Sequence, residues 1–272
     1  MNKVATKEDV GKFWDAASCG EAAYAVGLDD LSRLRAQAKA RYSLEPYIFD
    51  FARFPDASGK AVLEIGVGMG ADHEQWALNK PSRLCGIDLT ERAIEFTLKR
   101  FELAGLHSEL QVGDAENLPF PDRSFDIAYS WGVLHHSPDT QRGFNEVSRV
   151  LKPGGIARIM IYQKYSITGL LLWARYGAKQ NLSLAETYSQ YLESPGTKAY
   201  SVQEAGELCK KAGLSGVKIK IQLCSGDLLE GAAGQRHQGR LLSFAKAIWP
   251  RRLIKMFGRR LGLFMTIEAR RG

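Results

Sequence analysis

Short runs of strand-forming residues alternate with helix-like patterns from residue 61 to the end of the chain. A mostly apolar run bounded by glycine or other turn residues is typical of a buried strand in a parallel sheet. Seven runs fit this description: 61–66, 83–88, 108–113, 125–130, 155–161, 216–222 and 262–269. Because helical spacing separates most of them, the pattern predicts an α/β fold with a largely parallel sheet.

Helices between these runs carry recognisable start and stop signals. Thr90 and Asp139 are predicted N-caps, since their side chains can accept hydrogen bonds from a first helical turn. The helix after Asp139 is expected to stop at KPGG (152–155), because proline and glycine interrupt helices. Ser201 and Glu204 match a capping box and predict a further helix.

Two stretches interrupt the alternation and suggest how the chain is organised. Residues 1–60 have helical character and are predicted to form an N-terminal helical cap. Residues 163–200 form a connection long enough to indicate a substrate-side helical insertion. The core is expected to comprise 61–162, and its C-terminal part, with a basic segment, falls in 201–272.

Composition places the chain among ordinary globular proteins, with 45% hydrophobic and 25% charged residues. No apolar run approaches the ~18 residues that span a bilayer. The N-terminus lacks a signal-peptide pattern, which predicts a cytoplasmic location. Four widely spaced cysteines favour buried thiols in a reducing compartment over a zinc site or disulfides.

The net charge of +7 is concentrated near the C-terminus. Ten Lys/Arg and one acid lie from Arg236 onward, a local balance of +9, so the preceding 235 residues sum to −2. Within this part, 249–262 (WPRRLIKMFGRRLG) mixes basic and apolar residues. It fits a solvated connector, contact with an anionic membrane surface, or an RNA backbone. RNA is less favoured, because no known RNA-binding module accompanies it.

Glycines follow the first predicted strand at every second position, in VLEIGVGMG (62–70). Glycine lets a backbone turn tightly and lets a ligand approach its amide groups at a helix N-terminus. Asp88 ends the next predicted strand, 22 residues after Gly66, where a carboxylate suits the two hydroxyls of a ribose. NAD and S-adenosylmethionine both carry such a ribose, so these features fit either cofactor.

Further motifs separate the two cofactors: GIDLT (86–90), GDAENLPF (113–120), SFDIAYSWGVLHH (124–136) and RVLKPGG (149–155). With the glycine stretch, these motifs closely resemble the class I S-adenosylmethionine-dependent methyltransferases, in the branch that acts mainly on small molecules. The resemblance covers roughly 60–162. It implies a Rossmann-like sheet of seven strands in the order 3-2-1-4-5-7-6, the seventh antiparallel, with helices on both faces.

The resemblance also implies contacts along bound S-adenosyl-L-methionine. The residues expected to line the cofactor are Glu64, Gly66, Gly68, Gly70, Asp88, Leu89, Asp114, Ala115, Ser130 and Trp131. Asp88 would bind the ribose hydroxyls, Asp114 the adenine amino group, and Glu64 would complement the positive end. A structural pairing role for Glu64 is an alternative, because a buried carboxylate without partners costs several kcal/mol. Core packing is an equal alternative for Trp131.

Methyl transfer from a sulfonium is an in-line displacement, so the protein mainly holds the acceptor about 3 Å from the methyl and excludes water. His136 and His135 follow the fourth predicted strand and are candidate bases, with packing as the alternative. Tyr200, Tyr162 and His237 are weaker candidates, of which Tyr200 is kept as a third possible catalytic residue. No spacing of metal ligands is found, so no metal is expected.

The insertion combines an apolar patch at 169–173 with three tyrosines, which predicts a lid over an aromatic or lipid-like acceptor, or plain packing. The sequence therefore predicts a methyltransferase acting on O, N or C of a small or lipid-like metabolite. An RNA-directed methyltransferase, an NAD-dependent oxidoreductase and a non-catalytic binding module are the alternatives. Against an oxidoreductase, the segments 113–120 and 124–136 would have no role in hydride transfer. Against a non-catalytic binding module, the cofactor motifs show none of the defects that such a module would be expected to have.

Overall fold

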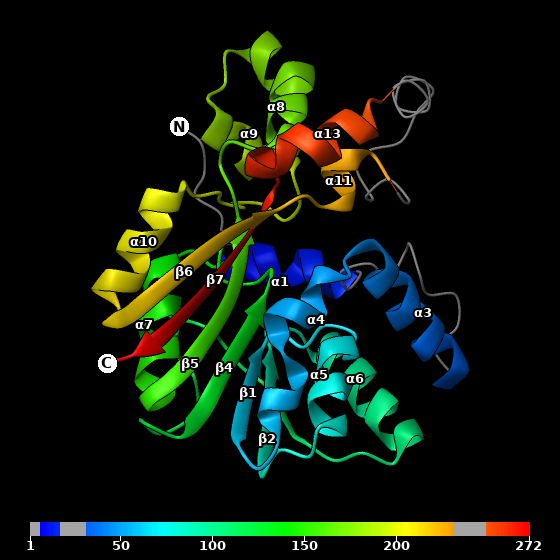
Figure 1. The fold of residues 1–272 in the computed structure, drawn as a ribbon, viewed down its shortest axis with the longest axis vertical. Helices are drawn as coiled ribbons and strands as arrows, with labels where there is room; N and C mark the ends of the chain where they lie inside the picture. The colour runs from blue at the N-terminus through cyan, green and yellow to red at the C-terminus, as the bar shows by residue number, and fades with distance from the viewer. Residues whose placement is uncertain (1–5, 17–30, 231–248) are drawn as a thin grey trace.

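The fold is taken from a computed structural model that describes residues 6–16, 31–230 and 249–272 (Figure 1). Its sheet has seven strands in the order β3-β2-β1-β4-β5-β7-β6, which confirms the implied topology. The strands are β1 (Ala61–Ile65), β2 (Arg83–Asp88), β3 (Glu109–Val112), β4 (Phe125–Trp131), β5 (Leu151–Tyr162), β6 (Leu214–Gln222) and β7 (Phe264–Arg271). Pairs among the first five strands are parallel, and β7 is antiparallel to both neighbours.

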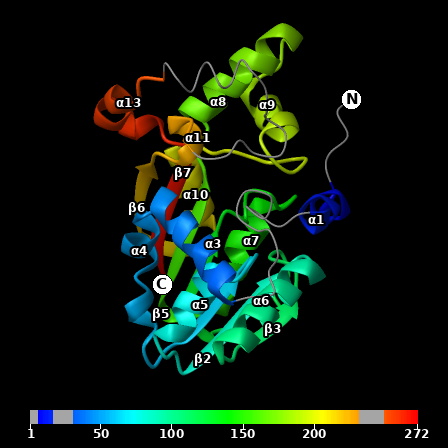
Figure 2. The ribbon, with the colours of Figure 1, turned by 90° about the vertical axis from the view of Figure 1, so that its right-hand side faces the viewer.

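Helices cover both faces of this sheet (Figures 1 and 2). Before β1 lie α1 (Lys7–Ala16), α3 (Leu31–Leu44), α4 (Tyr47–Ala52) and the short η1 (Phe54–Ala57). Between strands lie α5 (Ala71–Leu78), α6 (Glu91–Ala104), α7 (Thr140–Val150) and α10 (Val202–Lys211). Alternation along β1 separates the two cores: Leu63 belongs to the cluster with α7 and α10, and Val62 to the cluster with α4 and α5.

The remaining helices lie above the carboxyl ends of the parallel strands, at the top of Figure 1. They are α8 (Ile167–Leu172), the π-helical turn η2 (Trp173–Gly177), η3 (Ala178–Gln180), α9 (Leu184–Tyr191), α11 (Ser225–Leu228), α13 (Arg251–Phe257) and η4 (Gly258–Leu261). Ligands of open α/β sheets bind at this edge. Among the described residues, no helix combines the length and apolarity needed to cross a bilayer.

Local capping signals predicted the helix starts correctly. Thr90 and Asp139 each accept a backbone N–H of the first turn, and Ser201 and Glu204 form the capping box. The KPGG stretch needs a correction: α7 does stop before it, but residues 152–155 lie inside β5. The pairing register of β4 with β5 shifts there, so the extra residues bulge out and the strand continues past proline and glycine.

Candidate active site

The glycine turn joins β1 to α5 with all three glycines in left-handed conformations, at φ of 84° for Gly66, 53° for Gly68 and 76° for Gly70. A Cβ added to Gly66 would lie 2.1 Å from Val133, and one added to Gly70 would lie 2.9 Å from Thr97. At Gly68, no described atom lies within 4 Å of such a Cβ. The outer glycines are therefore required by packing, whereas the middle one borders open space that a ligand can enter.

Asp88 lies beside this open space at the end of β2. Its Oδ2 accepts the Gly68 N–H at 3.0 Å, and its Oδ1 accepts the N–H and hydroxyl of Thr90 at 3.1 and 3.0 Å. Burial raises the pKa of Asp88, against these hydrogen bonds to its charged form. Of the carboxylate's roughly four acceptor sites, these bonds use three, so Oδ2 can still receive one hydroxyl, and a second could bind Oδ1 by displacing the Thr90 hydroxyl. Leu89 follows it and is exposed at the same edge.

Glu64 has a partner for the structural pairing role that the sequence analysis gave as an alternative. Its side chain is buried, 2% exposed, and Oε2 lies 2.9 Å from Nδ1 of His73. The other ring nitrogen lies 2.7 Å from the Ser108 hydroxyl, which donates to the carbonyl of Leu84. Burial holds the pKa of Glu64 well above its usual range and lowers that of His73 to about 3. Together these directions favour a neutral pair in which protonated Glu64 donates to His73.

A second buried carboxylate, Asp72, lies in the first turn of α5 and connects the N-terminal helices to the glycine turn. Arg41 donates to its Oδ2 at 2.8 Å, and Tyr42 and Tyr129 donate their hydroxyls at 2.9 and 2.8 Å. The guanidinium also lies 5.9 Å from the ring centre of Trp131. Sequence reasoning missed this cluster, because Arg41 and Asp72 are distant in the chain and belong to different helices.

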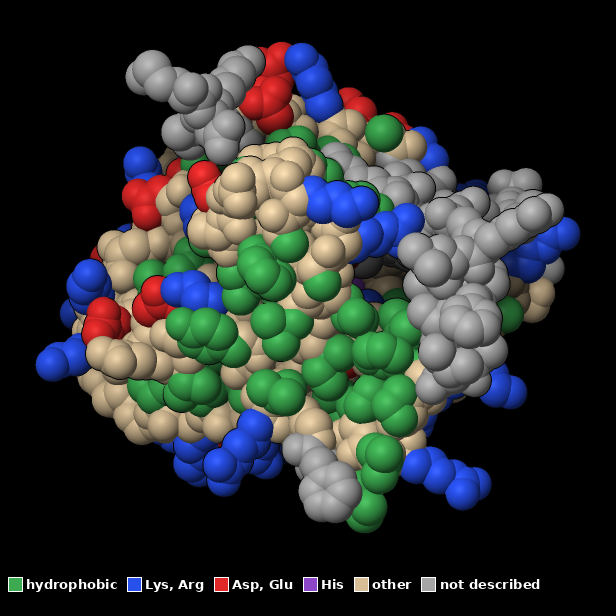
Figure 3. Space-filling model, turned by 90° about the horizontal axis from the view of Figure 1, so that it is seen from above, with side chains coloured by type: hydrophobic (Ala, Val, Ile, Leu, Met, Phe, Trp, Pro, Cys, Tyr) green, Lys and Arg blue, Asp and Glu red, His purple; other side chains and the backbone are tan. Residues whose placement is uncertain are grey.

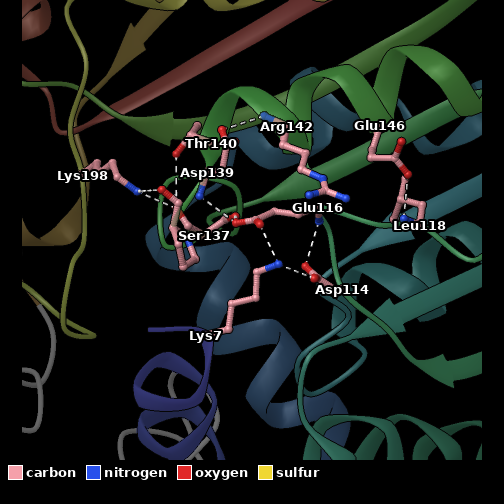
Figure 4. Close-up of polar contacts among 11 residues, drawn as sticks. Lys7, Asp114, Glu116, Leu118, Ser137, Asp139, Thr140, Arg142, Glu146 and Lys198 are labelled. Atoms are coloured by element: carbon pink, nitrogen blue, oxygen red, sulfur yellow. Dashed lines mark hydrogen bonds and ion pairs between the residues drawn. The ribbon is translucent and has the colours of Figure 1, made fainter. Parts of the chain in front are cut away.

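Asp114 belongs to a network centred on Lys7 of α1 (Figure 4). The Lys7 ammonium lies 2.6 Å from Asp114 Oδ2 and 2.6 Å from Glu116 Oε2. Asp114 Oδ1 accepts the Glu116 N–H at 2.8 Å. Glu116 is itself buried and accepts the Asp139 N–H and the Ser137 hydroxyl. The network joins α1, the 113–120 segment and the loop after β4; Ala115, also predicted, packs against the core there.

His136 is contacted by residues that follow α9 in the insertion. Its Nδ1 lies 2.8 Å from the Ser194 hydroxyl and 3.0 Å from that of Thr197. Its Nε2 lies 3.4 Å from Oε2 of Glu193, and this oxygen also accepts the Tyr162 hydroxyl at 2.7 Å. Burial acts to raise the pKa of Glu193, but the contacts with His136 and Tyr162 outweigh it and lower the pKa overall. Glu193 is therefore an ionised partner for His136.

His135 differs from its neighbour in having no hydrogen-bond partner for either ring nitrogen among the described residues. The ring is fully buried, with its centre 3.9 Å from that of Tyr162 and 4.2 Å from that of His136. Burial, followed by the proximity of His136 and Lys198, holds the pKa of His135 well below its usual range. The hydroxyl of Ser130 is likewise buried without a described partner. Unpaired buried polar atoms of this kind occur where ligands or waters bind.

Aromatic side chains surround this end of the sheet. Trp131 lies among Tyr47, Phe51 and Phe264, with ring centres 6.2, 5.9 and 5.7 Å away. Trp131 is therefore part of an aromatic wall between two core clusters.

Helix α1 extends over the same edge of the sheet. Its Trp14 is 5.3 Å from His136, edge to face. A Cβ added to Gly11 would lie 3.9 Å from Leu89, and Lys7 reaches Asp114. The helix thus runs over the predicted cofactor residues to the histidines.

The third predicted base, Tyr200, is placed elsewhere. Its backbone N–H donates to the Tyr162 carbonyl at 2.9 Å, but its side chain lines a hollow between α7 and α10. That hollow is also lined by Gln141, Glu204, Glu207, Leu208 and Lys211. In the described part of the chain, no side-chain hydrogen bond joins Tyr200 to His136 or Glu193. His237 lies outside the described residues. Across those ranges, no group of three or more His, Cys, Asp or Glu side chains could hold a metal ion.

Comparisons with known proteins identify the family of the core of the sheet. Residues 63–159 match the family described as a methyltransferase domain. Over 116 residues, the chain is 40% identical to a fatty-acid O-methyltransferase of Mycolicibacterium smegmatis. The aligned stretch is 42% of this chain and 41% of that protein. Over 102 residues, it is 43% identical to a phthiotriol/phenolphthiotriol dimycocerosates methyltransferase of Mycobacterium tuberculosis, covering 37% of each. The matches thus span about two fifths of these relatives' length.

A solved structure shows that the fold extends over nearly the whole chain. The cyclase SpnF has a TM-score of 0.60 at 16% identity and covers 98% of this chain and 97% of that one. A likeness at this identity concerns the fold and leaves the reaction open. The sequence matches provide the assignment: residues 63–159 are a methyltransferase domain of the class I, S-adenosylmethionine-dependent type.

Proposed function

We propose that the protein transfers the methyl group of S-adenosylmethionine to a hydroxyl oxygen of a lipid-like acceptor. The observation that carries this proposal is the His136–Glu193 pair at the carboxyl end of β4. Trp14 packs against His136, and Tyr47 lies near Trp131 at the same end of the sheet. The names of two relatives, a fatty-acid O-methyltransferase and a phthiotriol/phenolphthiotriol dimycocerosates methyltransferase, support a lipid-like acceptor.

The residues present fit the cofactor. Open space at Gly68 lies beside Asp88, whose Oδ2 has an acceptor site left for a ribose hydroxyl. The unpaired Ser130 hydroxyl, at the end of β4, is available to a ligand in the same region. Bound S-adenosylmethionine supplies an electrophilic methyl on a positively charged sulfur, and the protein has only to orient an acceptor toward it.

The His136–Glu193 pair would take the proton that a hydroxyl acceptor loses: Nδ1 of His136 would receive it through the Ser194 hydroxyl, 2.8 Å away, while Nε2 faces Glu193. The ionised Glu193 carboxylate stabilises positive charge on the His136 ring, and the Tyr162 hydroxyl holds that carboxylate in place. A base of this kind typically contributes 10²- to 10⁴-fold. An ionised fatty acid would not need one. Arg41, a cation that would suit a carboxylate acceptor, is already bound to Asp72.

The segments that cover the His136–Glu193 pair would exclude water. Trp14 of α1 and the 193–197 segment both contact the His136 ring, and Tyr188 anchors the insertion by a 3.0 Å hydrogen bond to the carbonyl of Gln163. Exclusion of water protects the reactive methyl and strengthens electrostatic effects inside the site.

The test is a comparison of acceptors with one chain length but different ends. A long-chain alcohol, fatty acid and amine, each dispersed in detergent, are incubated with methyl-labelled S-adenosylmethionine, and the extracted products are analysed by mass spectrometry. The proposal predicts an ether from the alcohol, at a rate that drops about 100-fold in Glu193→Gln. Methylation of the amine alone, or an ester formed equally fast by Glu193→Gln, would overturn it.

A further inference from the structure

Large exposed hydrophobic side chains are concentrated on the face above the carboxyl ends of the strands. Of the twelve such residues in the described part of the chain, half come from two short segments around α8 and α13. They are Tyr165, Leu170, Trp173, Leu253, Met256 and Leu261. Figure 3 looks down on this face and shows hydrophobic side chains gathered together, with Lys and Arg around them and some Asp and Glu on one side. We call these two segments, 165–185 and 249–262, the platform.

Asp227 holds the two halves of the platform together. It is fully buried, and its carboxylate accepts the N–H of Thr168 at 3.0 Å and that of Leu263 at 2.8 Å. Its carbonyl accepts the Trp249 indole N–H at 2.9 Å. Thr168 lies in the first turn of α8, whereas Trp249 and Leu263 flank α13 and η4. Both views of the ribbon place α8 beside α13 (Figures 1 and 2). The exposed apolar residues therefore belong to one anchored surface.

The charge of the platform is uniformly positive. Residues 165–185 contain two Lys/Arg and 249–262 contain five, and neither segment has an Asp or Glu. Two acids border the platform: Glu186 directly follows the first segment, and Glu230 lies 3.0 Å from Lys255. Arg175, Lys179 and Arg252 are exposed next to the apolar residues. Exposed leucine, methionine and tryptophan among arginines and lysines match the interface of an anionic bilayer.

We propose that the platform docks on the surface of an anionic phospholipid membrane. The apolar side chains would enter the acyl boundary, and the basic ones would contact the head groups. The proposal rests on the proposed function, because a lipid-like acceptor would then reach the His136–Glu193 pair from the membrane side of the protein. An RNA backbone would satisfy the positive charge but would leave Leu253 and Met256 in water.

Vesicle flotation tests the proposal with the full-length protein. Vesicles of phosphatidylglycerol mixed with phosphatidylcholine are compared with phosphatidylcholine alone, at low and at high salt. The expected result is binding to the anionic vesicles, weakened by salt and reduced at least tenfold in Leu253→Gln/Met256→Gln. The matched control is Leu78→Gln/Leu98→Gln: these side chains are 52% and 50% exposed, against 56% and 63% for the platform pair, but lie on α5 and α6.

A second variant separates the two contributions. Arg252→Gln/Arg260→Gln is expected to reduce binding to anionic vesicles and to remove part of its salt dependence. Equal binding by the platform and control pairs, indifference to phosphatidylglycerol, or binding to single-stranded RNA but not to vesicles would each overturn the proposal. Turnover of the detergent-dispersed alcohol, which needs no vesicle, is measured in parallel. Failure there with intact vesicle binding would count against the proposed function alone.

Discussion

The imidazole of His136 and the carboxylate of Glu193 lie 3.4 Å apart, Nε2 to Oε2, although one follows β4 and the other follows α9 in the 163–200 segment. The Tyr162 hydroxyl, from the end of β5, donates to the same carboxylate oxygen at 2.7 Å. Three parts of the chain therefore meet at one polar spot. The insertion supplies a charged group to this spot in addition to covering it.

Replacing Glu193 with Gln should slow transfer to a hydroxyl acceptor about 100-fold and leave the dissociation constant of S-adenosylhomocysteine unchanged. The reason is that glutamine keeps the shape but cannot balance positive charge on His136. Steady-state kcat and its pH profile provide the measurement. Tyr162→Phe is the control: it removes a hydrogen bond but no charge, so its loss should be smaller. A Glu193→Gln profile that matches the wild type would contradict a role in proton transfer.

Replacing Lys7 with Met should speed the dissociation of S-adenosylhomocysteine about threefold to tenfold. Lys7, which is partly exposed, attaches α1 to Asp114 and to the buried Glu116, and an ion pair at a protein surface contributes about 0.2–1 kcal/mol. Stopped-flow displacement measures the rate. Lys12→Met is the matched control, since Lys12 pairs with Glu8 within α1 itself. High salt should bring the wild type toward the Lys7→Met rate. A variant that releases the ligand more slowly would indicate that Lys7 competes for Asp114.

Comparing alanine substitutions at two glycines with similar backbone conformations distinguishes an effect on ligand binding from an effect of backbone strain. Gly68 and Gly105 have φ of 53° and 64°, and a Cβ at either would meet no described atom within 4 Å. Alanine at each should cost about 1 kcal/mol of unfolding free energy, because the left-handed conformation disfavours a side chain. Only Gly68→Ala should also lose affinity for S-adenosylhomocysteine. Denaturant unfolding and calorimetry check both effects; full affinity in Gly68→Ala would place the ligand elsewhere.

His135 should make the protein less stable as the pH falls below about 6.5. Its folded-state pKa is held well below the ordinary value, mainly by burial, so the unfolded chain takes up a proton that the native state does not. The unfolding free energy then falls by up to about 1.4 kcal/mol per pH unit. His73 acts in the same direction, and Glu64, whose pKa is raised, acts in the opposite one. Comparing wild type with His135→Phe at several pH values isolates the effect of His135. Parallel curves would contradict it.

Much of the fold could be predicted from the sequence because its determinants are local. Thr90 and Asp139 cap helices through residues three positions away, and glycines at 66 and 70 mark a turn that packing enforces. The exception is KPGG at 152–155, where pairing with β4 continues the strand through residues that usually end one. Tertiary hydrogen bonding overrode the local preference there.

The site was only partly predictable. Several of the residues that contact it come from distant segments whose position in the fold no local sequence pattern specifies. The positions of Asp88 and Asp114 follow from strand ends, but their neighbours do not. Lys7 reaches Asp114 across 107 positions in the chain, and Glu193 approaches His136 from an insertion whose course no local pattern specifies. Glu64 shows the same limit: a carboxylate inside a buried strand signals a partner, and the structure identifies that partner as His73.

The most direct test of the whole account is a calorimetric titration with S-adenosylhomocysteine, with NADH as the comparison ligand, on the wild type and on Asp88→Ala. The account predicts binding of S-adenosylhomocysteine alone, lost in a variant whose unfolding curve shows that it remains folded. Binding of NADH in its place, or an affinity for S-adenosylhomocysteine that does not depend on Asp88, would contradict it.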